Sequence, residues 1–383
     1  MASELEALLV RHVGAETVPG AVALRGGRDP EVVAVGVASI AGKPMREDAI
    51  FRIQSMTKPL TALAALRLVE SGRIRLDESV EPWLPELGDR RVLTSPGAPL
   101  DDTVAANRPI TLRHLLTMGS GYGMEFGETP LQKAMADDGT DAGPEPIALG
   151  ADEWLARLAE LPLAFQPGEG WRYHHSFALL GILLARVTGR PLKAHLADDL
   201  FDPLGMPDTA FWVPQEKLDR LPAAYRHSDG GLVEMEPAGG GFYAGPPPFD
   251  VSHAEIVSTA GDFHRFLRML VEREPVLGAP LISEEHLRQM TTDQVPAGNK
   301  TPDSFFPGFW DGTGWGFGVG VETSGPNRRR YGWSGGQGTN FYVDPDGTVG
   351  ILFTQVEMGE QMARMINEFQ ALPPSSLGGL SHG

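Results

Sequence analysis

The clearest hydrophobic pattern in the chain runs from residue 55 to residue 72, where apolar side chains recur at the helical period. The positions that fit this period are Leu60, Leu63, Ala64 and Leu68. Pro59 has no backbone N–H and is tolerated only in the first turn of a helix, so the helix is expected to begin near Ser55 or Met56. Gly72 is expected to cap its C-terminus. The pattern therefore predicts a buried helix with Ser55 at its N-terminus.

Strand patterns occur at the two ends of the chain, and helical patterns lie between them. The expected strands are 21–25, 31–38, 316–321, 329–333, 339–343 and 349–354. The expected helices are an amphipathic segment at the N-terminus, 111–116, 151–158, 176–189 and 357–369. The Gly/Pro-rich stretch 239–249 is expected to be irregular and to form a rim loop or lid.

This order of elements predicts an α+β fold. One antiparallel sheet is built from both chain ends and flanked by helices, and a mostly helical lobe is inserted between them. The expected division is a discontinuous sheet domain of 1–75 and 250–383, with a helical domain of 76–249. The tail 372–383 is expected to be disordered.

Composition excludes several classes of function. The formal charge of −18 argues against nucleic acid or an anionic membrane as a partner, and the absence of cysteine excludes disulfides and thiolate metal sites. The N-terminus lacks a signal-peptide pattern, and no apolar run approaches the roughly 20 residues needed to span a bilayer. We expect a cytoplasmic protein without metal or cofactor, and the sequence leaves its oligomeric state open.

Ser55 and Lys58 are three residues apart and are expected on one face of the predicted helix. This is the arrangement of a nucleophile with its own base, and the free N–H groups of a helix N-terminus can stabilise an oxyanion. The alternative from position alone is that Ser55 only caps the helix and Lys58 is solvated.

Two distant segments offer partners for this pair. Tyr173 lies just before an apolar helix and could act as a general base, or its ring could simply pack against the start of that helix. Gly335 and Gly336 would let a strand edge approach a bound substrate closely and offer it a backbone N–H.

Taken in order along nearly the whole chain, these motifs resemble the serine β-lactamase and penicillin-binding protein superfamily. Within it, the chain is most similar to class C β-lactamases and family VIII carboxylesterases. The segments that carry the resemblance are the strand pair before Phe51, Ser55-Met56-Thr57-Lys58, 110–117, Phe165-Gln166-Pro167-Gly168, Tyr173, Pro203-Leu204-Gly205-Met206, 257–262 and Gly335-Gly336.

The resemblance implies a β-lactamase/transpeptidase-like fold and an acyl-enzyme mechanism. Ser55 would be the nucleophile, and Lys58 and Tyr173 would share the proton transfers, with the choice of base left open. The backbone N–H groups of Ser55 and Gly336 would form the oxyanion hole, and Tyr173 would activate the water that releases the acyl group.

Two departures from the family pattern bear on the substrate. Relatives that act on β-lactams usually have Tyr-x-Asn and Lys-Thr-Gly where this chain has Tyr173-His174-His175 and Trp333-Ser334-Gly335. The missing asparagine and cation favour neutral esters, unless Arg330 faces inward and restores a positive charge. The expected substrate-binding residues are His175, Trp333, Ser334, Gly335, Phe242, Tyr243 and Phe249.

The sequence thus favours a serine carboxylesterase with a small-molecule ester or amide as its partner. Alternatives on the same fold are an acyltransferase and a β-lactam or peptide amide hydrolase, and a different class is a non-catalytic binding or scaffold module. Gly332-Trp333-Ser334-Gly335-Gly336 also matches the G-x-S-x-G nucleophile elbow. That motif needs a helix next and a later acid and histidine, and a predicted strand follows here instead.

Overall fold

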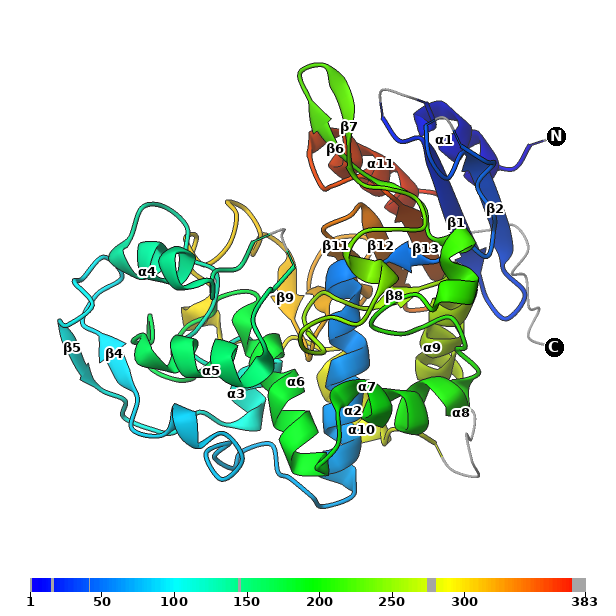
Figure 1. The fold of residues 1–383 in the computed structure, drawn as a ribbon. Helices are drawn as coiled ribbons and strands as arrows, with labels where there is room; N and C mark the ends of the chain where they lie inside the picture. The colour runs from blue at the N-terminus through cyan, green and yellow to red at the C-terminus, as the bar shows by residue number, and fades with distance from the viewer. Residues whose placement is uncertain (1, 15–16, 41, 144–145, 274–279, 374–383) are drawn as a thin grey trace.

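Both ends of the chain contribute to one seven-stranded sheet (Figure 1). The computed structural model describes residues 2–14, 17–40, 42–143, 146–273 and 280–373. The strand order is β2-β1-β13-β12-β11-β10-β9, and every neighbouring pair is antiparallel. The strands are β1 (Gly20–Gly26), β2 (Glu31–Gly36), β9 (Thr313–Trp315), β10 (Gly320–Glu322), β11 (Tyr331–Gly335), β12 (Thr339–Val343) and β13 (Val349–Thr354). The prediction of an antiparallel sheet built from both chain ends is confirmed.

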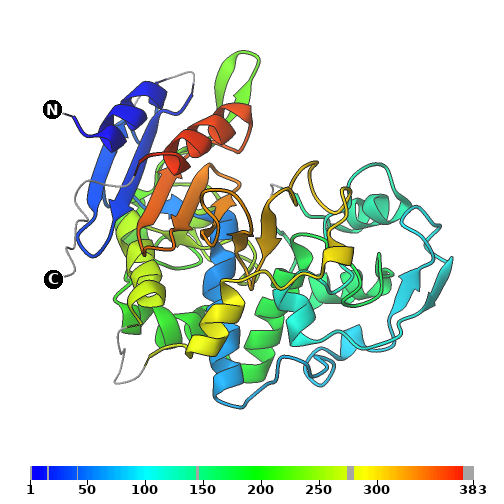
Figure 2. The ribbon, with the colours of Figure 1, turned by 180° about the vertical axis from the view of Figure 1, so that it is seen from behind.

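Both faces of this sheet are covered by helices, because the side chains of each strand alternate between two apolar clusters. Val22 and Leu24 of β1 belong to the main core, whereas Ala21 and Ala23 belong to a second cluster on the other face. Helices α1 (Glu4–His12) and α11 (Glu360–Gln370) cover that second face. Helix α9 (Ala260–Glu272) covers the first, as Figure 2 shows from behind.

Helix α2 (Thr57–Glu70) runs between the sheet and the helical part of the molecule (Figures 1 and 2). It is buried on all sides over residues 57–66, so it is a central helix. The other helices are α3 (Leu112–Leu116), α4 (Pro130–Asp138), α5 (Ala151–Glu160), α6 (His175–Thr188), α7 (Leu192–Leu196), α8 (Asp202–Leu204) and α10 (Glu284–Met290). Short helical turns are η1 (Gln54–Met56), η2 (Pro85–Leu87), η3 (Ala197–Phe201), η4 (Gln215–Arg220), η5 (Phe242–Ala244) and η6 (Ala297–Asn299).

Three two-stranded sheets complete the fold. They pair β3 (Phe51–Arg52) with β8 (Val257–Ser258), β4 (Arg91–Leu93) with β5 (Thr103–Ala105), and β6 (Ala224–Ser228) with β7 (Gly231–Glu236). No helix within the described residues has the length and apolar character to cross a membrane.

The prediction of one strand over 316–321 is wrong, because residues 316–319 form the bend between β9 and β10 and only Gly320 and Val321 lie in a strand. Gly318 has φ +81°, and a Cβ there would lie 2.9 Å from the carbonyl oxygen of Lys58. The bend therefore packs against the start of α2, which is a tertiary contact that local alternation does not reveal. The division into two domains stays a prediction, and all but the first two residues of the predicted disordered tail lie outside the described residues.

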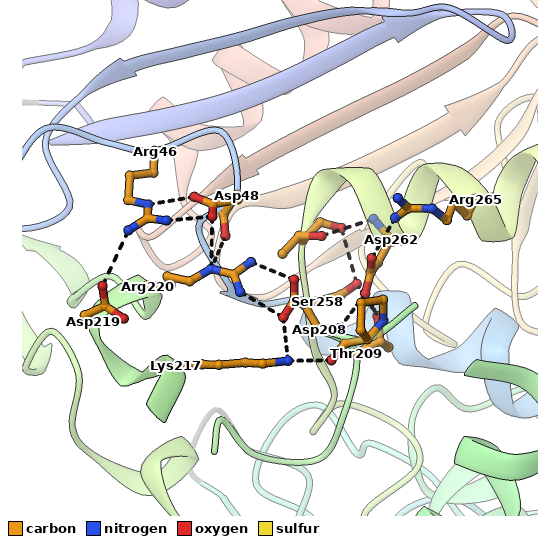
Figure 3. Close-up of polar contacts among 12 residues, drawn as sticks. Arg46, Asp48, Asp208, Thr209, Lys217, Asp219, Arg220, Ser258, Asp262 and Arg265 are labelled. Atoms are coloured by element: carbon orange, nitrogen blue, oxygen red, sulfur yellow. Dashed lines mark hydrogen bonds and ion pairs between the residues drawn. The ribbon is translucent and has the colours of Figure 1, made fainter. Parts of the chain in front are cut away.

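A polar network fixes the segment that leads into α2 (Figure 3). Arg220 donates to both carboxylate oxygens of Asp208, at 2.9 and 2.7 Å, and to the carbonyl oxygen of Asp48. The backbone N–H of Asp208 donates to Asp262 at the start of α9. Since Asp48 lies just before β3, the network joins the segment before Ser55 to the segment that carries β8.

We expect Asp208→Asn to lower the free energy of unfolding by about 1–3 kcal/mol at pH 7, because Arg220 and Lys217 lose a charged acceptor. Burial acts to raise the pKa of Asp208, but the hydrogen bonds from Arg220 and Lys217 outweigh it and hold the pKa below its ordinary value of 3.8. A carboxylate whose pKa is lower in the folded state than in the unfolded state stabilises the protein fully at pH values above the unfolded-state pKa. This stabilisation is lost as the pH falls through the pKa of the folded state. Urea unfolding of both proteins at pH 7 and at pH 3 measures the difference.

The matched control is Asp219→Asn, because the Asp219 side chain is 57% exposed and its ion pair with Arg46 is 3.4 Å long. This variant should stay within about 0.5 kcal/mol of wild type. An Asp208→Asn protein as stable as the control would show that the network adds nothing to stability.

Candidate active site

Ser55 lies in the single turn η1, directly before helix α2. Pro59 is in the first turn of α2, as expected from its missing N–H. Gln54, the residue before the serine, has φ +48°, a left-handed conformation that is uncommon for a residue with a side chain. The Gln54 amide donates to the Tyr243 hydroxyl at 2.9 Å, so a side-chain contact helps to hold this backbone conformation in place.

Lys58 is completely buried, with no exposed surface. Its Nζ lies 2.8 Å from Ser55 Oγ and donates to the carbonyl oxygen of His253 at 2.7 Å. Burial lowers the pKa of Lys58 well below its ordinary value of 10.5, because an ammonium group loses its hydration there. A neutral amine beside the serine hydroxyl can accept its proton.

Tyr173 reaches the same serine from the loop before α6. Its hydroxyl lies near the Ser55 side chain and accepts from Trp333 Nε1 at 2.6 Å. Lys58 Nζ lies 4.4 Å from the centre of the tyrosine ring. Burial raises the pKa of Tyr173 above its ordinary value of 10, so the phenol keeps its proton at neutral pH. The structure thus brings Ser55, Lys58 and Tyr173 together as the sequence predicted.

The C-terminal end of β11 lies against the turn that carries Ser55. A Cβ at Gly335 would lie 2.4 Å from the carbonyl oxygen of Ile53, so only glycine allows this approach. Thr339 Oγ1 donates to that same carbonyl oxygen at 3.1 Å, which ties β12 to the turn as well. Gly336 follows directly, and a Cβ there would lie 3.8 Å from Gln54 Oε1, so its backbone lies close to η1.

The predicted substrate-binding residues lie in three different places. Trp333 contacts Tyr173, with ring centres 5.5 Å apart, and Gly335 lies against η1. Tyr243 is buried in a small apolar cluster, and its hydroxyl accepts from the Gln54 amide. Phe242 packs against this cluster. Ser334 Oγ accepts from Asn340 at 3.0 Å.

His175 and Phe249 lie together in the helical part of the molecule. His175 is 1% exposed, its Nε2 is 2.7 Å from the carbonyl oxygen of Thr140, and its ring stacks on Trp154. Phe249 also packs against Trp154, with ring centres 6.2 Å apart. These two residues have interior contacts, so their role as substrate contacts stays a prediction.

Arg330 does not supply the missing cation. It donates to Asp344 at 2.7 Å and lies over the ring of Tyr342, which belongs to the cluster on the other face of the sheet from Trp333. Ser334 is followed by β12 rather than by a helix, so the context that a nucleophile elbow needs is missing. Within the described residues, no group of three or more His, Cys, Asp and Glu side chains is arranged to hold a metal ion.

Sequence reasoning missed two histidines beside Lys58. The rings of His174 and His253 are 3.8 Å apart, and His174 has φ +96°. Burial lowers the pKa of both, so both are neutral at neutral pH. His253 has no local signal, since it is 195 residues from Lys58 in the chain. His174 follows Tyr173 directly, but its contact with the His253 ring arises only in the folded chain.

Comparison with known proteins identifies the family of this chain. The Beta-lactamase family model matches residues 5–372. Protein Rv1367c of Mycobacterium tuberculosis is 34% identical over 324 residues, which is 82% of this chain and 79% of that protein. Esterase EstB of Burkholderia gladioli is 38% identical over 218 residues, or 55% of this chain and 52% of EstB.

Among solved structures, EstCE1, described as a hydrolase with promiscuous acyltransferase activity, superposes with a TM-score of 0.74. It is 24% identical, and the match covers 95% of this chain and 97% of that one. This likeness extends over the whole fold, including the sheet from both chain ends and the helical part between them. With a family model that spans 5–372, the chain belongs to the beta-lactamase family.

Proposed function

We propose that this protein is a serine carboxylesterase that cleaves neutral esters through an acyl-Ser55 intermediate. The observation that carries the proposal is a fully buried lysine amine 2.8 Å from Ser55 Oγ and 4.4 Å from the ring centre of Tyr173. The esterase among the relatives supports this choice of reaction.

In the proposed mechanism, the neutral amine of Lys58 takes the hydroxyl proton of Ser55 while Oγ attacks the ester carbonyl carbon. The backbone N–H groups of Ser55 and Gly336 stabilise the resulting oxyanion. Tyr173 gives its proton to the alcohol oxygen as the C–O bond breaks, and it regains a proton from the Lys58 ammonium. Water then attacks the acyl-enzyme, and the protons return to Ser55 by the reverse route.

The pKa directions assign the two proton carriers to different roles. Burial lowers the pKa of Lys58, which favours the form that accepts a proton, and raises the pKa of Tyr173, which favours the form that donates one. We therefore propose Lys58 as the base and Tyr173 as the acid during acylation. Trp333 Nε1 orients the phenol by its hydrogen bond.

An acyltransferase is the second candidate, because an alcohol in place of water would capture the same acyl-enzyme. The description of EstCE1 supports this possibility. Product analysis with an added alcohol acceptor separates the two reactions, since transfer yields a new ester and hydrolysis yields only the acid.

Rapid acid quenching with an excess of p-nitrophenyl butyrate should trap a butyryl adduct that intact mass spectrometry detects. Peptide mapping should locate the adduct at Ser55, because Lys58 and Tyr173 activate only this hydroxyl. A fluorophosphonate probe should label the same residue.

The Ser55→Ala protein should form neither adduct, whereas Ser334→Ala should form both. Labelling at Ser334, or turnover that Ser55→Ala leaves intact, would overturn the proposed function. The absence of any adduct in wild type would favour a non-catalytic module on this fold.

A further inference from the structure

Two phenylalanines are unusually exposed, and they converge on one point. Among the described residues, the aromatic side chains with a large exposed fraction are Phe126, at 46%, and Phe306, at 54%. Both contact the half-buried Phe305, with ring centres 6.1 and 4.6 Å from it. Clustered apolar surface of this kind marks binding sites more often than isolated exposed residues do. We name Phe126, Phe305 and Phe306 the aromatic strip.

The strip is continuous with the candidate active site. The ring centre of Phe305 lies 4.9 Å from that of Tyr173, and Phe305 stacks on Trp333 at 6.5 Å. A series of contacting aromatic rings therefore runs from Tyr173, the proposed proton donor, to the exposed rings of Phe126 and Phe306.

The two loops that carry the strip are attached to the residues around Tyr173. Arg172, which is 8% exposed, pairs with Glu125 at 3.5 Å and with Asp303 at 3.6 Å. The N–H of Met124 donates to the carbonyl oxygen of Tyr173 at 2.8 Å. The strip is thus held in a fixed relation to the catalytic tyrosine rather than lying on free loops.

The position of the strip assigns it to one half of an ester. Tyr173 is the group that gives its proton to the leaving oxygen, so the alcohol half of a bound ester lies on the side of Tyr173. Phe305 packs against this tyrosine and against the Trp333 ring that hydrogen-bonds its hydroxyl, whereas the proposed oxyanion donors are the backbone N–H groups of Ser55 and Gly336. Asp303 beside the strip is 67% exposed, which disfavours an anionic alcohol.

We propose that the aromatic strip binds the apolar alkyl or aryl group of the ester's alcohol half, and so selects esters of neutral, hydrophobic alcohols. This inference rests on the proposed function and deepens it. An alcohol acceptor in acyl transfer would occupy the same surface, because transfer is the reverse of acylation.

Two ester series test the proposal. One varies the alcohol from methyl to hexyl acetate, and the other varies the acid from methyl acetate to methyl hexanoate. In wild type, kcat/KM should rise along the alcohol series by up to about fourfold per methylene, the value for full burial of each group. In the Phe126→Ala/Phe306→Ala double variant, the ratio of kcat/KM for hexyl acetate to kcat/KM for methyl acetate should fall about tenfold. The dependence of kcat/KM on the length of the acid should be the same as in wild type.

The control variant is Ile40→Ala, which removes an apolar side chain that is 49% exposed and belongs to another part of the sequence. Its ratio for hexyl to methyl acetate should equal that of wild type. Thermal melting of all variants checks folding, and the exposed positions of Phe126 and Phe306 make large losses of stability unexpected.

An unchanged ratio in the double variant would overturn the proposal, and a loss confined to the acid series would overturn the assignment to the alcohol half. Ser55→Ala keeps this inference separate from the proposed function. If Ser55→Ala is inactive while the double variant keeps the wild-type ratio, the strip assignment fails and the esterase assignment stands. If Ser55→Ala keeps full activity, the proposed function itself fails.

Discussion

Lys58→Met is expected to lower kcat/KM for ester hydrolysis by about 10⁴-fold. Methionine fills much of the space of the completely buried side chain but has no group that can accept the Ser55 proton. The carbonyl oxygen of His253 also loses its donor, so melting of the variant must be measured beside its activity. Steady-state kinetics with p-nitrophenyl butyrate and with ethyl butyrate gives the size of the loss.

The pH profile of wild type gives a second measure of the same role. Because burial lowers the pKa of Lys58, the amine is protonated and inactive below this lowered value and free to act as a base above it. We expect kcat/KM to rise with pH through that value and then to level off. The residual activity of Lys58→Met should lack this acid limb.

Lys133→Met is the matched control, since Lys133 is 75% exposed and pairs with Asp137 on the surface of α4. It should keep wild-type kinetics. A folded Lys58→Met protein with more than about a tenth of wild-type activity would contradict the assignment of the base, because a general base contributes at least about 10²-fold.

Tyr173→Phe is expected to have an effect that depends on the leaving group. It keeps the ring that packs against Trp333 and Phe305 but removes the hydroxyl near Ser55. An alkoxide must be protonated to leave, whereas p-nitrophenolate leaves without a proton. We expect kcat/KM to fall about 10³-fold for ethyl butyrate and about tenfold for p-nitrophenyl butyrate.

An equal loss of kcat/KM for both esters would contradict the role of Tyr173 as the acid. It would indicate that Tyr173 acts in the activation of Ser55 instead. Tyr225→Phe is the control. Its hydroxyl accepts from the backbone N–H of Ile40 at 2.9 Å, and its ring lies in the cluster on the far face of the sheet. This variant should not change the ratio of the two rates.

The part of the site that could be predicted from the residues alone lies within one turn of one helix. Ser55 and Lys58 are three residues apart, and Pro59 limits where the helix can begin, so their proximity follows from local geometry. Tyr173 is different, because its position in the sequence allowed two interpretations. Its side chain could carry a proton, or its ring could pack against the start of the next helix. Only the resemblance over the whole chain favoured the catalytic role before the structure brought its hydroxyl to Ser55.

Most strands of the sheet could also be predicted from local sequence patterns. The prediction fails where a tertiary contact determines the backbone conformation. The strands β12 and β13 coincide with the predicted ranges because apolar residues and a clear turn define them. Most of the expected strand at 316–321 is a bend instead, because Gly318 approaches the carbonyl oxygen of Lys58 and only Gly320 and Val321 belong to β10. The apolar and polar alternation of that segment gives no information about its contact with Lys58, which lies 260 residues earlier in the chain.

The sequence by itself determined that Ser55 and Lys58 lie together at the start of one helix and that one sheet is made from both chain ends, because these features depend on spacing within an element and on the order of elements. The tertiary structure decided which residues surround them. Phe305 and Trp333 contact Tyr173 from two separate segments, and Phe126 contacts Phe305 from a third. Tyr243 is hydrogen-bonded to Gln54, whereas His175 packs into the interior. Contacts between segments far apart in the chain arise only when the core packs, and the chemistry of a substrate pocket is made of such contacts.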